Sequence, residues 1–232
     1  MADAAGTPRR RAIDAVLFDL DGTLADTAPD LAAALNRVRR DRGLEPVPLA
    51  TLRPYASHGA RGLIGAGMAV APVDPGYEEL RDAFLAHYAA ALCVDSTLFA
   101  EVDAVLDALD ARALPWGIVT NKATRYTEPL LLSLRLASRA GAVVCGDTTA
   151  HAKPHPAPLT EAASRLGVAP GRCVYVGDAR RDIDAGKAAG MRTLVARWGY
   201  LEPGDVPDEW SADGVIDAPR ALLDWLRAID DR

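Results

Sequence analysis

The fold is decided by the stretch Ile13-Asp14-Ala15-Val16-Leu17-Phe18-Asp19-Leu20-Asp21-Gly22-Thr23. Its first six residues form an apolar run of strand length, and two aspartates follow where that strand ends. Asp19 and Asp21 concentrate negative charge, which is costly unless a cation or a reacting group offsets it. Ligands bind at the carboxyl ends of strands in open α/β sheets. The stretch therefore predicts a metal-dependent active site in which Asp19 can attack an electrophile.

Length and composition predict a globular protein with one large domain, or a core with a smaller insert. The chain has 232 residues, of which 50% are hydrophobic and 25% charged. That length can bury a large core without disulfides. The net charge is −6, and no basic patch is long enough to suggest nucleic acid, since the run Arg9-Arg10-Arg11 is short. We therefore expect no nucleic-acid partner, and an anionic substrate would need local cations or a metal.

The cysteines and the hydropathy pattern favour the cytoplasm. Cys93, Cys145 and Cys173 are dispersed and lack metal-ligand spacing, as expected of reduced, buried thiols. No secretory signal is visible, because aspartates interrupt the first apolar stretch. No segment approaches the length of a membrane span, so we expect no membrane partner.

Residues 28–95 carry helical patterns and no strand signal. Asp26 or Thr27 can cap a helix whose first turn accepts Pro29, and Gly43 is a natural stop. Further helices are predicted at Leu49–Tyr55, Ser57–Met68 and Tyr77–Leu92. We therefore expect an all-helical insert at 28–95, with hinges near 26–28 and 95–98.

After the insert, helices and strands alternate along the chain. The predicted helices are 102–111, 124–135, 158–166, 182–189 and 220–229, and the predicted strands are 114–119, 142–145, 173–176, 193–196 and 214–216. Such alternation indicates a parallel sheet with helices on both faces. The fold class is thus α/β, with a doubly wound core formed by 1–27 and 96–232.

Polar side chains follow several of these strands and belong to loops that share one edge of a parallel sheet. They are Asp19 and Asp21, Thr120 and Asn121, Lys153, and Asp178 with Asp182. Together they provide what phosphoryl transfer needs: a nucleophile, a cation and oriented donors. Any one of them alone could be a helix cap or a surface residue.

Each residue type suits one role in that reaction. Asp19 can form an aspartyl-phosphate, and Asp21 can act as general acid and then as general base. Asp19 and Asp178 can hold Mg²⁺, which takes carboxylates, waters and substrate phosphate. Thr120 and Asn121 can hydrogen-bond phosphoryl oxygens, and Lys153 can offset the charges of nucleophile and phosphate.

The order of these motifs resembles the haloacid dehalogenase (HAD) superfamily. The matching residues are Asp19-Leu20-Asp21-Gly22-Thr23-Leu24, Thr120-Asn121, Lys153-Pro154, and Gly177-Asp178 with Asp182. The resemblance implies a Rossmann-like core with a helical cap at 28–95. It also implies that the main-chain carbonyl of Asp21 helps to hold Mg²⁺, and that Asp182 supports the metal site through its ligands.

Branches of the superfamily differ in the second aspartate and in substrate. Asp21 argues against dehalogenases and phosphonatases, whereas a β-phosphoglucomutase-like phosphosugar mutase keeps it. A non-catalytic HAD-like binding protein would have no need of Asp21. Hydrolysis of a small phosphorylated metabolite is the preferred interpretation, by a monomer or homodimer.

Local segments also bear on the substrate. Residues 26–31, 116–122 and 153–156 resemble the phosphoglycolate phosphatase group. Residues 57–61 and 199–210 are closer to a sister group that hydrolyses N-acetylmuramic acid 6-phosphate. Both substrates carry a carboxylate, which arginine binds with two parallel hydrogen bonds, so Arg61 is the candidate specificity residue.

Overall fold

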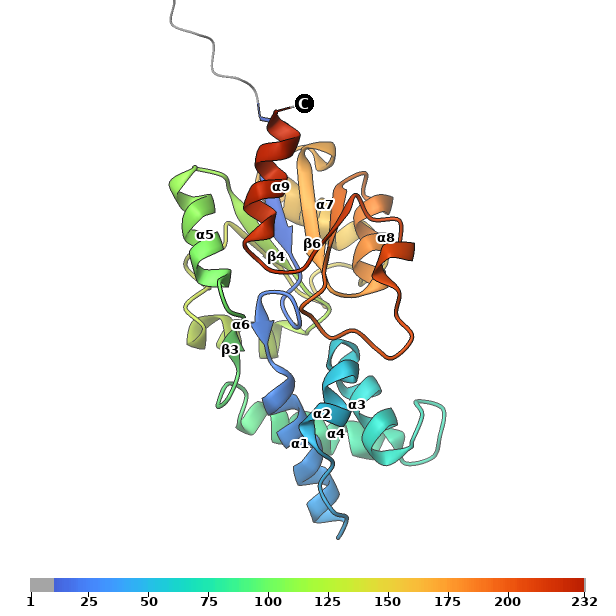
Figure 1. Cartoon of the computed structure of the whole chain (residues 1–232). Helices are drawn as coiled ribbons and strands as arrows, with labels where there is room; N and C mark the ends of the chain where they lie inside the picture. Colours follow the sequence, from blue (N-terminus) through green and yellow to red (C-terminus); the bar gives the residue numbers. More distant parts are fainter. Residues whose placement is uncertain (1–10, 232) are drawn as a thin grey trace, which may run out of the picture.

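The core of the protein is a six-stranded parallel sheet in the order β5-β4-β1-β6-β7-β8. Figure 1 shows this sheet with helices packed around it. The computed structural model describes residues 11–231, so residues 1–10 of the predicted core segment, with Arg9 and Arg10, lie outside it. The strands are β1 (Ala15–Phe18), β4 (Trp116–Val119), β5 (Ala142–Val144), β6 (Cys173–Gly177), β7 (Arg192–Ala196) and β8 (Gly214–Ile216). This arrangement confirms the predicted doubly wound α/β fold class.

Strand β1 lies between β4 and β6 and is buried on both faces. Its side chains alternate between two clusters, because successive residues of a strand point to opposite sides. Val16 and Phe18 join one cluster, whereas Ala15 and Leu17 join the other. A continuous apolar run of this kind is typical of a strand covered by helices on both sides.

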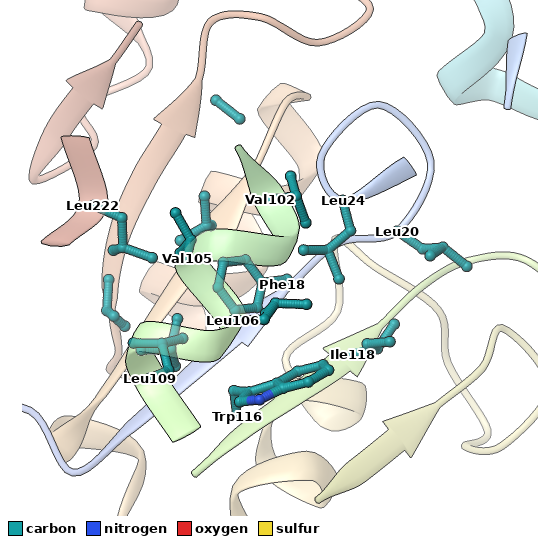
Figure 2. Close-up of a cluster of buried hydrophobic side chains, with 14 of the residues drawn as sticks. Phe18, Leu20, Leu24, Val102, Val105, Leu106, Leu109, Trp116, Ile118 and Leu222 are labelled. Atoms are coloured by element: carbon teal, nitrogen blue, oxygen red, sulfur yellow. The ribbon is translucent and has the colours of Figure 1, made fainter. Parts of the chain in front are cut away.

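Five helices of the core cover these two faces. They are α5 (Val102–Ala111), α6 (Thr124–Ser133), α7 (Ala157–Arg165), α8 (Arg180–Ala188) and α9 (Ala221–Asp230). Helices α5 and α9 contribute Leu106, Leu109 and Leu222 to the cluster around Phe18 and Trp116, shown in Figure 2. Helices α7 and α8 contribute to the cluster on the opposite face of the sheet.

The segment 28–95 folds as a group of helices below the sheet in Figure 1. It contains α1 (Ala28–Asp41), α2 (Leu49–Leu52), the 3-10 helix η1 (Arg53–His58), α3 (Gly59–Met68) and α4 (Tyr77–Ala90). Leu31, Leu35 and Val38 of α1 are buried in its apolar cluster. The predicted helices Leu49–Tyr55 and Ser57–Met68 are divided differently, because Gly59, with φ +56°, starts a new helix.

The structure adds a two-stranded antiparallel ribbon that the sequence did not predict. Strand β2 (Ala25–Asp26) pairs with β3 (Thr97–Leu98). Two-residue strands carry too few side chains to show a period of two. The ribbon brings together the two chain connections between the helical segment and the sheet.

Two further observations concern the described part of the chain. None of its helices is both long enough and apolar enough to cross a membrane. The three cysteines are unpaired; Cys145 and Cys173 are buried, whereas Cys93 is only half-buried.

Candidate active site

The three central strands end at one edge of the sheet, and each carries a predicted site residue just beyond its end. Asp19 follows β1, Thr120 follows β4, and Asp178 follows β6. The backbone continues to pair there, since the N–H of Asp19 donates to the carbonyl of Val176 at 2.9 Å. The order of strands reverses around β1, which is where open α/β sheets form ligand crevices.

Three carboxylates meet at this edge. One oxygen each of Asp19, Asp178 and Asp182 lies within 4.8 Å of the others, and all three side chains are buried. Burial raises the pKa of Asp19 to about 6 and, with the charges of Asp19 and Asp182, that of Asp178 to about 7. Three buried carboxylates provide hard oxygen donors and negative charge, which fit a divalent cation such as Mg²⁺.

Lys153 supplies one buried positive charge to the cluster. Its Nζ lies 2.8 Å from Oδ1 of Asp19 and 2.8 Å from Oδ1 of Asp182. Burial opposes its charge, but the two carboxylates raise its pKa. Lys153 and Arg181 likewise lower the pKa of Asp182 against the effect of burial. Asp182 also caps α8, because its Oδ2 accepts the N–H of Ala179 at 3.0 Å.

The side chain of Asn121 holds the backbone of Lys153. Its Oδ1 accepts the N–H of Lys153 at 3.0 Å, and its Nδ2 donates to the carbonyl of Lys153 at 2.9 Å. Thr120 differs, because its hydroxyl oxygen accepts the N–H of Lys122 at 3.1 Å and its proton is donated to no residue in the range 11–231. Thr120 can therefore donate a hydrogen bond to a ligand, whereas Asn121 holds the backbone of Lys153 in place.

Asp21 lies beside the carboxylate cluster and is held by a second lysine. Nζ of Lys122 lies 2.8 Å from Oδ1 of Asp21, and the hydroxyl of Thr27 donates to the same oxygen. Lys122 also lies over the ring of Tyr88, 4.8 Å from its centroid. The pKa of Lys122 is raised by Asp21 and Tyr88, although burial opposes this. Oδ2 of Asp21 accepts no hydrogen bond from residues 11–231, which leaves it available to a ligand.

Gly22 lets the chain turn close to Asp178. Its φ is +87°, and a Cβ there would stand 2.1 Å from Oδ2 of Asp178. Gly199 approaches from the loop after β7, where a Cβ would stand 2.2 Å from the Cβ of Asp178. Both glycines are needed because the backbone itself forms the wall around this carboxylate.

The helical segment contributes side chains from η1. The hydroxyl of Ser57 donates to Oδ2 of Asp178 at 2.9 Å, and Nε2 of His58 pairs with Oε1 of Glu202. Arg181 donates through Nη2 to the carbonyl of Ser57 at 2.8 Å. The contact between His58 and Glu202 connects the segments 57–61 and 199–210, both of which resemble the sister group in sequence.

A cavity of about 850 Å³ lies between the helical segment and the sheet edge. Asp19, Asp21, Thr120, Asn121 and Lys153 all line it. The charged residues of its lining comprise seven basic and four acidic side chains: Arg61, Arg81, Lys122, Arg125, Lys153, Arg180 and Arg181, and Asp19, Asp21, Glu202 and Asp205. Arg61 is exposed and lies on this wall, without a hydrogen bond to any residue of the described range. Asp178 and Asp182 lie behind the lining.

Sequence reasoning assigned no role to Lys122, Arg181 or Tyr200. Lys122 directly follows Thr120-Asn121, and Arg181 directly precedes Asp182, so their neighbours in the sequence could have marked both as site residues. Tyr200 is a buried aromatic residue, and its backbone N–H also donates to Oδ2 of Asp178 at 2.8 Å. Its hydroxyl accepts the N–H groups of Thr27 and Ala28 at 2.7 and 2.9 Å. Nothing in the sequence brings residue 200 to residue 27.

Comparisons with known proteins agree with this geometry. The family model described as haloacid dehalogenase-like hydrolase matches residues 16–196. N-Acetylmuramic acid 6-phosphate phosphatase of Pseudomonas aeruginosa is 41% identical over 224 residues, covering 96% of this chain and 99% of that protein. Phosphoglycolate phosphatase of Xanthomonas campestris is 44% identical over 209 residues, covering 90% and 94%. A crystal structure of a predicted phosphoglycolate phosphatase from Haemophilus somnus superposes with a TM-score of 0.79 at 25% identity, covering 92% and 98%.

Proposed function

The chain belongs to the haloacid dehalogenase-like hydrolase family, and on that basis we propose that it is a magnesium-dependent phosphomonoesterase acting through an aspartyl-phosphate. The observation that carries the proposal is the placement of Asp19. Its carboxylate is buried, lies 2.8 Å from Nζ of Lys153, and lines a large cavity. A carboxylate held in this way can react with a phosphoryl group while Lys153 balances part of the charge.

Asp21 is the proposed acid and base. An oxygen of Asp19 attacks phosphorus, the bond from phosphorus to the ester oxygen breaks, and Asp21 gives a proton to the departing alcohol. Asp21 then takes a proton from a water molecule that attacks the phospho-Asp19, which releases phosphate and restores both carboxyl groups. Lys122 and Thr27 fix Oδ1 of Asp21, so Oδ2 is the atom that would carry the proton.

Phosphate binding falls to neighbouring groups. The free proton of the Thr120 hydroxyl can donate to a phosphoryl oxygen, while Asn121 keeps Lys153 in place through its backbone. Asp19, Asp178 and the main-chain carbonyl of Asp21 would hold Mg²⁺, and Asp182 would support them through Lys153. When bound, the cation neutralises charge on the transferred phosphoryl oxygens.

Replacing the nucleophile tests the chemistry. Asp19→Asn keeps the size of the side chain and removes its negative charge, so turnover should fall to background while the fold is retained. Phosphate release with Mg²⁺ measures the first expectation, and circular dichroism with thermal unfolding measures the second. Persistent turnover in a folded variant would refute Asp19 as the nucleophile.

The first candidate substrate is 2-phosphoglycolate, hydrolysed to glycolate and phosphate. The relatives from Xanthomonas and Xylella, each 44% identical, are named phosphoglycolate phosphatase. We propose that 28–95 acts as a cap that excludes water while the intermediate forms. Arg61, on the cap side of the cavity, would bind the carboxylate of the substrate.

The second candidate is N-acetylmuramic acid 6-phosphate. Two Pseudomonas relatives, each 41% identical, carry that phosphatase name. The cavity of about 850 Å³ favours this substrate, since pockets of that order bury ligands much larger than a two-carbon acid. The contact between His58 and Glu202 also joins the two segments that resemble the sister group.

One assay separates the two candidates. Phosphate release from 2-phosphoglycolate and from N-acetylmuramic acid 6-phosphate is compared at equal concentrations with Mg²⁺, with Asp19→Asn as the blank. A higher kcat/KM for 2-phosphoglycolate supports the first candidate, and a higher value for the muramic sugar supports the second. Return of phosphate to the sugar would point instead to a mutase.

A further inference from the structure

One oxygen of Asp178 receives two hydrogen bonds from distant parts of the chain. Oδ2 accepts the backbone N–H of Tyr200 at 2.8 Å and the hydroxyl of Ser57 at 2.9 Å. Among the residues that the structure describes, only the hydroxyl of Thr23 donates a hydrogen bond to Oδ1, at 3.4 Å. The two donors therefore fix the carboxylate through Oδ2 and leave Oδ1 for a cation.

The hydroxyl of Ser57 is committed to this contact. Within the described range it makes no hydrogen bond to its own helix η1 or to other parts of the helical segment. Its carbonyl accepts Nη2 of Arg181, so the residue is held at two points by the loop and helix that follow β6. A purely local role, such as capping η1, does not account for this orientation.

The contact exists only while the helical segment rests on the core. Ser57 and Asp178 are 121 residues apart, one in η1 and the other at the end of β6. Beside them, His58 pairs with Glu202, and its Nδ1 lies 3.4 Å from Nη1 of Arg181. Movement of η1 away from the core would take the Ser57 donor from Asp178.

We infer that Ser57 is a positioning residue for the metal-site carboxylate Asp178, so that Mg²⁺ binding and docking of η1 on the core favour each other. The inference rests on the proposed function, because it takes Asp178 as a metal ligand. A hydrogen-bond donor to the carboxylate oxygen that does not bind the metal fixes the orientation of that carboxylate. Loss of such donors commonly weakens metal affinity. By linkage, if docking of η1 raises the affinity for Mg²⁺, then binding of Mg²⁺ must favour docking of η1 by the same factor.

Magnesium affinity of the full chain tests the first half of the inference. Isothermal titration calorimetry with MgCl₂ should show Ser57→Ala binding about tenfold more weakly than the wild type. Ser57→Thr keeps the hydroxyl and should stay within about threefold of wild type. Unfolding midpoints in metal-free buffer establish that each variant is folded.

A matched control removes a different hydrogen bond from a hydroxyl to a carboxylate, away from the proposed metal site. The Thr124 hydroxyl donates to Oδ1 of Asp147 at 2.5 Å, and neither residue lines the cavity. Thr124→Val should therefore bind Mg²⁺ as the wild type does. Equal affinity of Ser57→Ala and wild type, or equal weakening in Thr124→Val, overturns the inference.

Hydrogen exchange tests the reciprocal half. Mg²⁺ should slow exchange of backbone amides in 53–61 of the wild type, and the slowing should be largely lost in Ser57→Ala. No slowing in the wild type would overturn the linkage. If the wild type releases phosphate and binds Mg²⁺ but Ser57→Ala is unaltered, this inference alone fails. If the wild type neither binds Mg²⁺ nor releases phosphate, the proposed function fails and the inference falls with it.

Discussion

Asp178 carries an electrostatic cost in the metal-free protein. Burial, with the nearby charges of Asp19 and Asp182, raises its pKa from 3.8 to about 7. Between these values the folded protein holds a proton that the unfolded chain has lost. The free energy of unfolding therefore falls as the pH rises from about 4 to about 7, and the cost is complete above that range.

Asp178→Asn should stabilise the metal-free protein in a pH-dependent way. Asparagine resembles the protonated acid, so the gain should reach a few kcal/mol near pH 8, at about 1.4 kcal/mol for each unit of pKa, and should shrink towards pH 4. Urea denaturation with a chelator at both pH values measures it. Asp224→Asn, at an exposed position, is the control and should change little. A gain that is the same at both pH values would contradict the assignment of the cost to Asp178.

Lys122 is expected to position Asp21. Lys122→Met removes the cation 2.8 Å from Oδ1 of Asp21, so kcat should fall by roughly 10²-fold while KM changes little. Steady-state kinetics on the preferred substrate separates these constants, and Lys122→Arg should recover part of kcat. A raised KM with unchanged kcat would show that Lys122 binds substrate instead.

The site residues differ in how far the sequence could predict them. Asp19, Thr120 and Asp178 each follow an apolar strand, so short-range pattern places them at one sheet edge. The position of Lys122 against Tyr88 depends on α4 packing over the core, and Arg181 reaches Ser57 across the cavity. Such contacts arise from tertiary packing, which leaves no periodic signal in a single sequence.

At the scale of elements, the strands of the sheet and the helices were predictable from the sequence. The junction between the helical segment and the sheet, formed by β2, β3 and the residues around them, was not. Helix α5 spans Val102–Ala111 as expected, because its buried residues recur with helical spacing. The junction instead depends on polar contacts: Arg53 makes two hydrogen bonds to Asp26, at 2.8 and 2.9 Å, and the Tyr200 hydroxyl donates to the same carboxylate at 2.8 Å. This network holds β2 through the side chain of Asp26.

Tyr200→Phe tests the junction. It leaves the buried N–H groups of Thr27 and Ala28 without their acceptor, so the free energy of unfolding should fall by about 1–3 kcal/mol. Tyr88→Phe is a matched control, because the buried Tyr88 hydroxyl accepts no backbone N–H from residues 11–231. Urea denaturation should show a change within about 0.5 kcal/mol for this control. Equal losses in the two variants would mean that the Tyr200 hydroxyl does not hold the junction.

At the scale of the whole molecule, the charge of the cavity opposes that of the chain. The protein carries a net charge of −6, yet the cavity lining has seven basic side chains against four acidic ones. A cleft with one excess sign and low-dielectric walls concentrates ligands of the opposite charge. The acidic exterior repels anions, so capture of the proposed phosphorylated substrate should depend on this local field and on the cation proposed to bind at Asp19 and Asp178.

Higher ionic strength should therefore weaken substrate binding more than it slows the chemical step. Raising NaCl from about 20 to about 500 mM shortens the screening distance from roughly 20 Å to roughly 4 Å, so KM should rise several-fold while kcat changes little. A carboxylated phosphate ester should be affected more than an aryl phosphate without a carboxylate, because it carries one more negative charge into the same field. Arg61→Ala should reduce that difference, since Arg61 is an exposed cation on the cavity wall without a partner in residues 11–231. Steady-state kinetics on both esters at both salt concentrations measures these effects. Identical salt dependence for the two esters would show that the basic lining does not distinguish the carboxylate, and Arg61 would lose its proposed role in specificity.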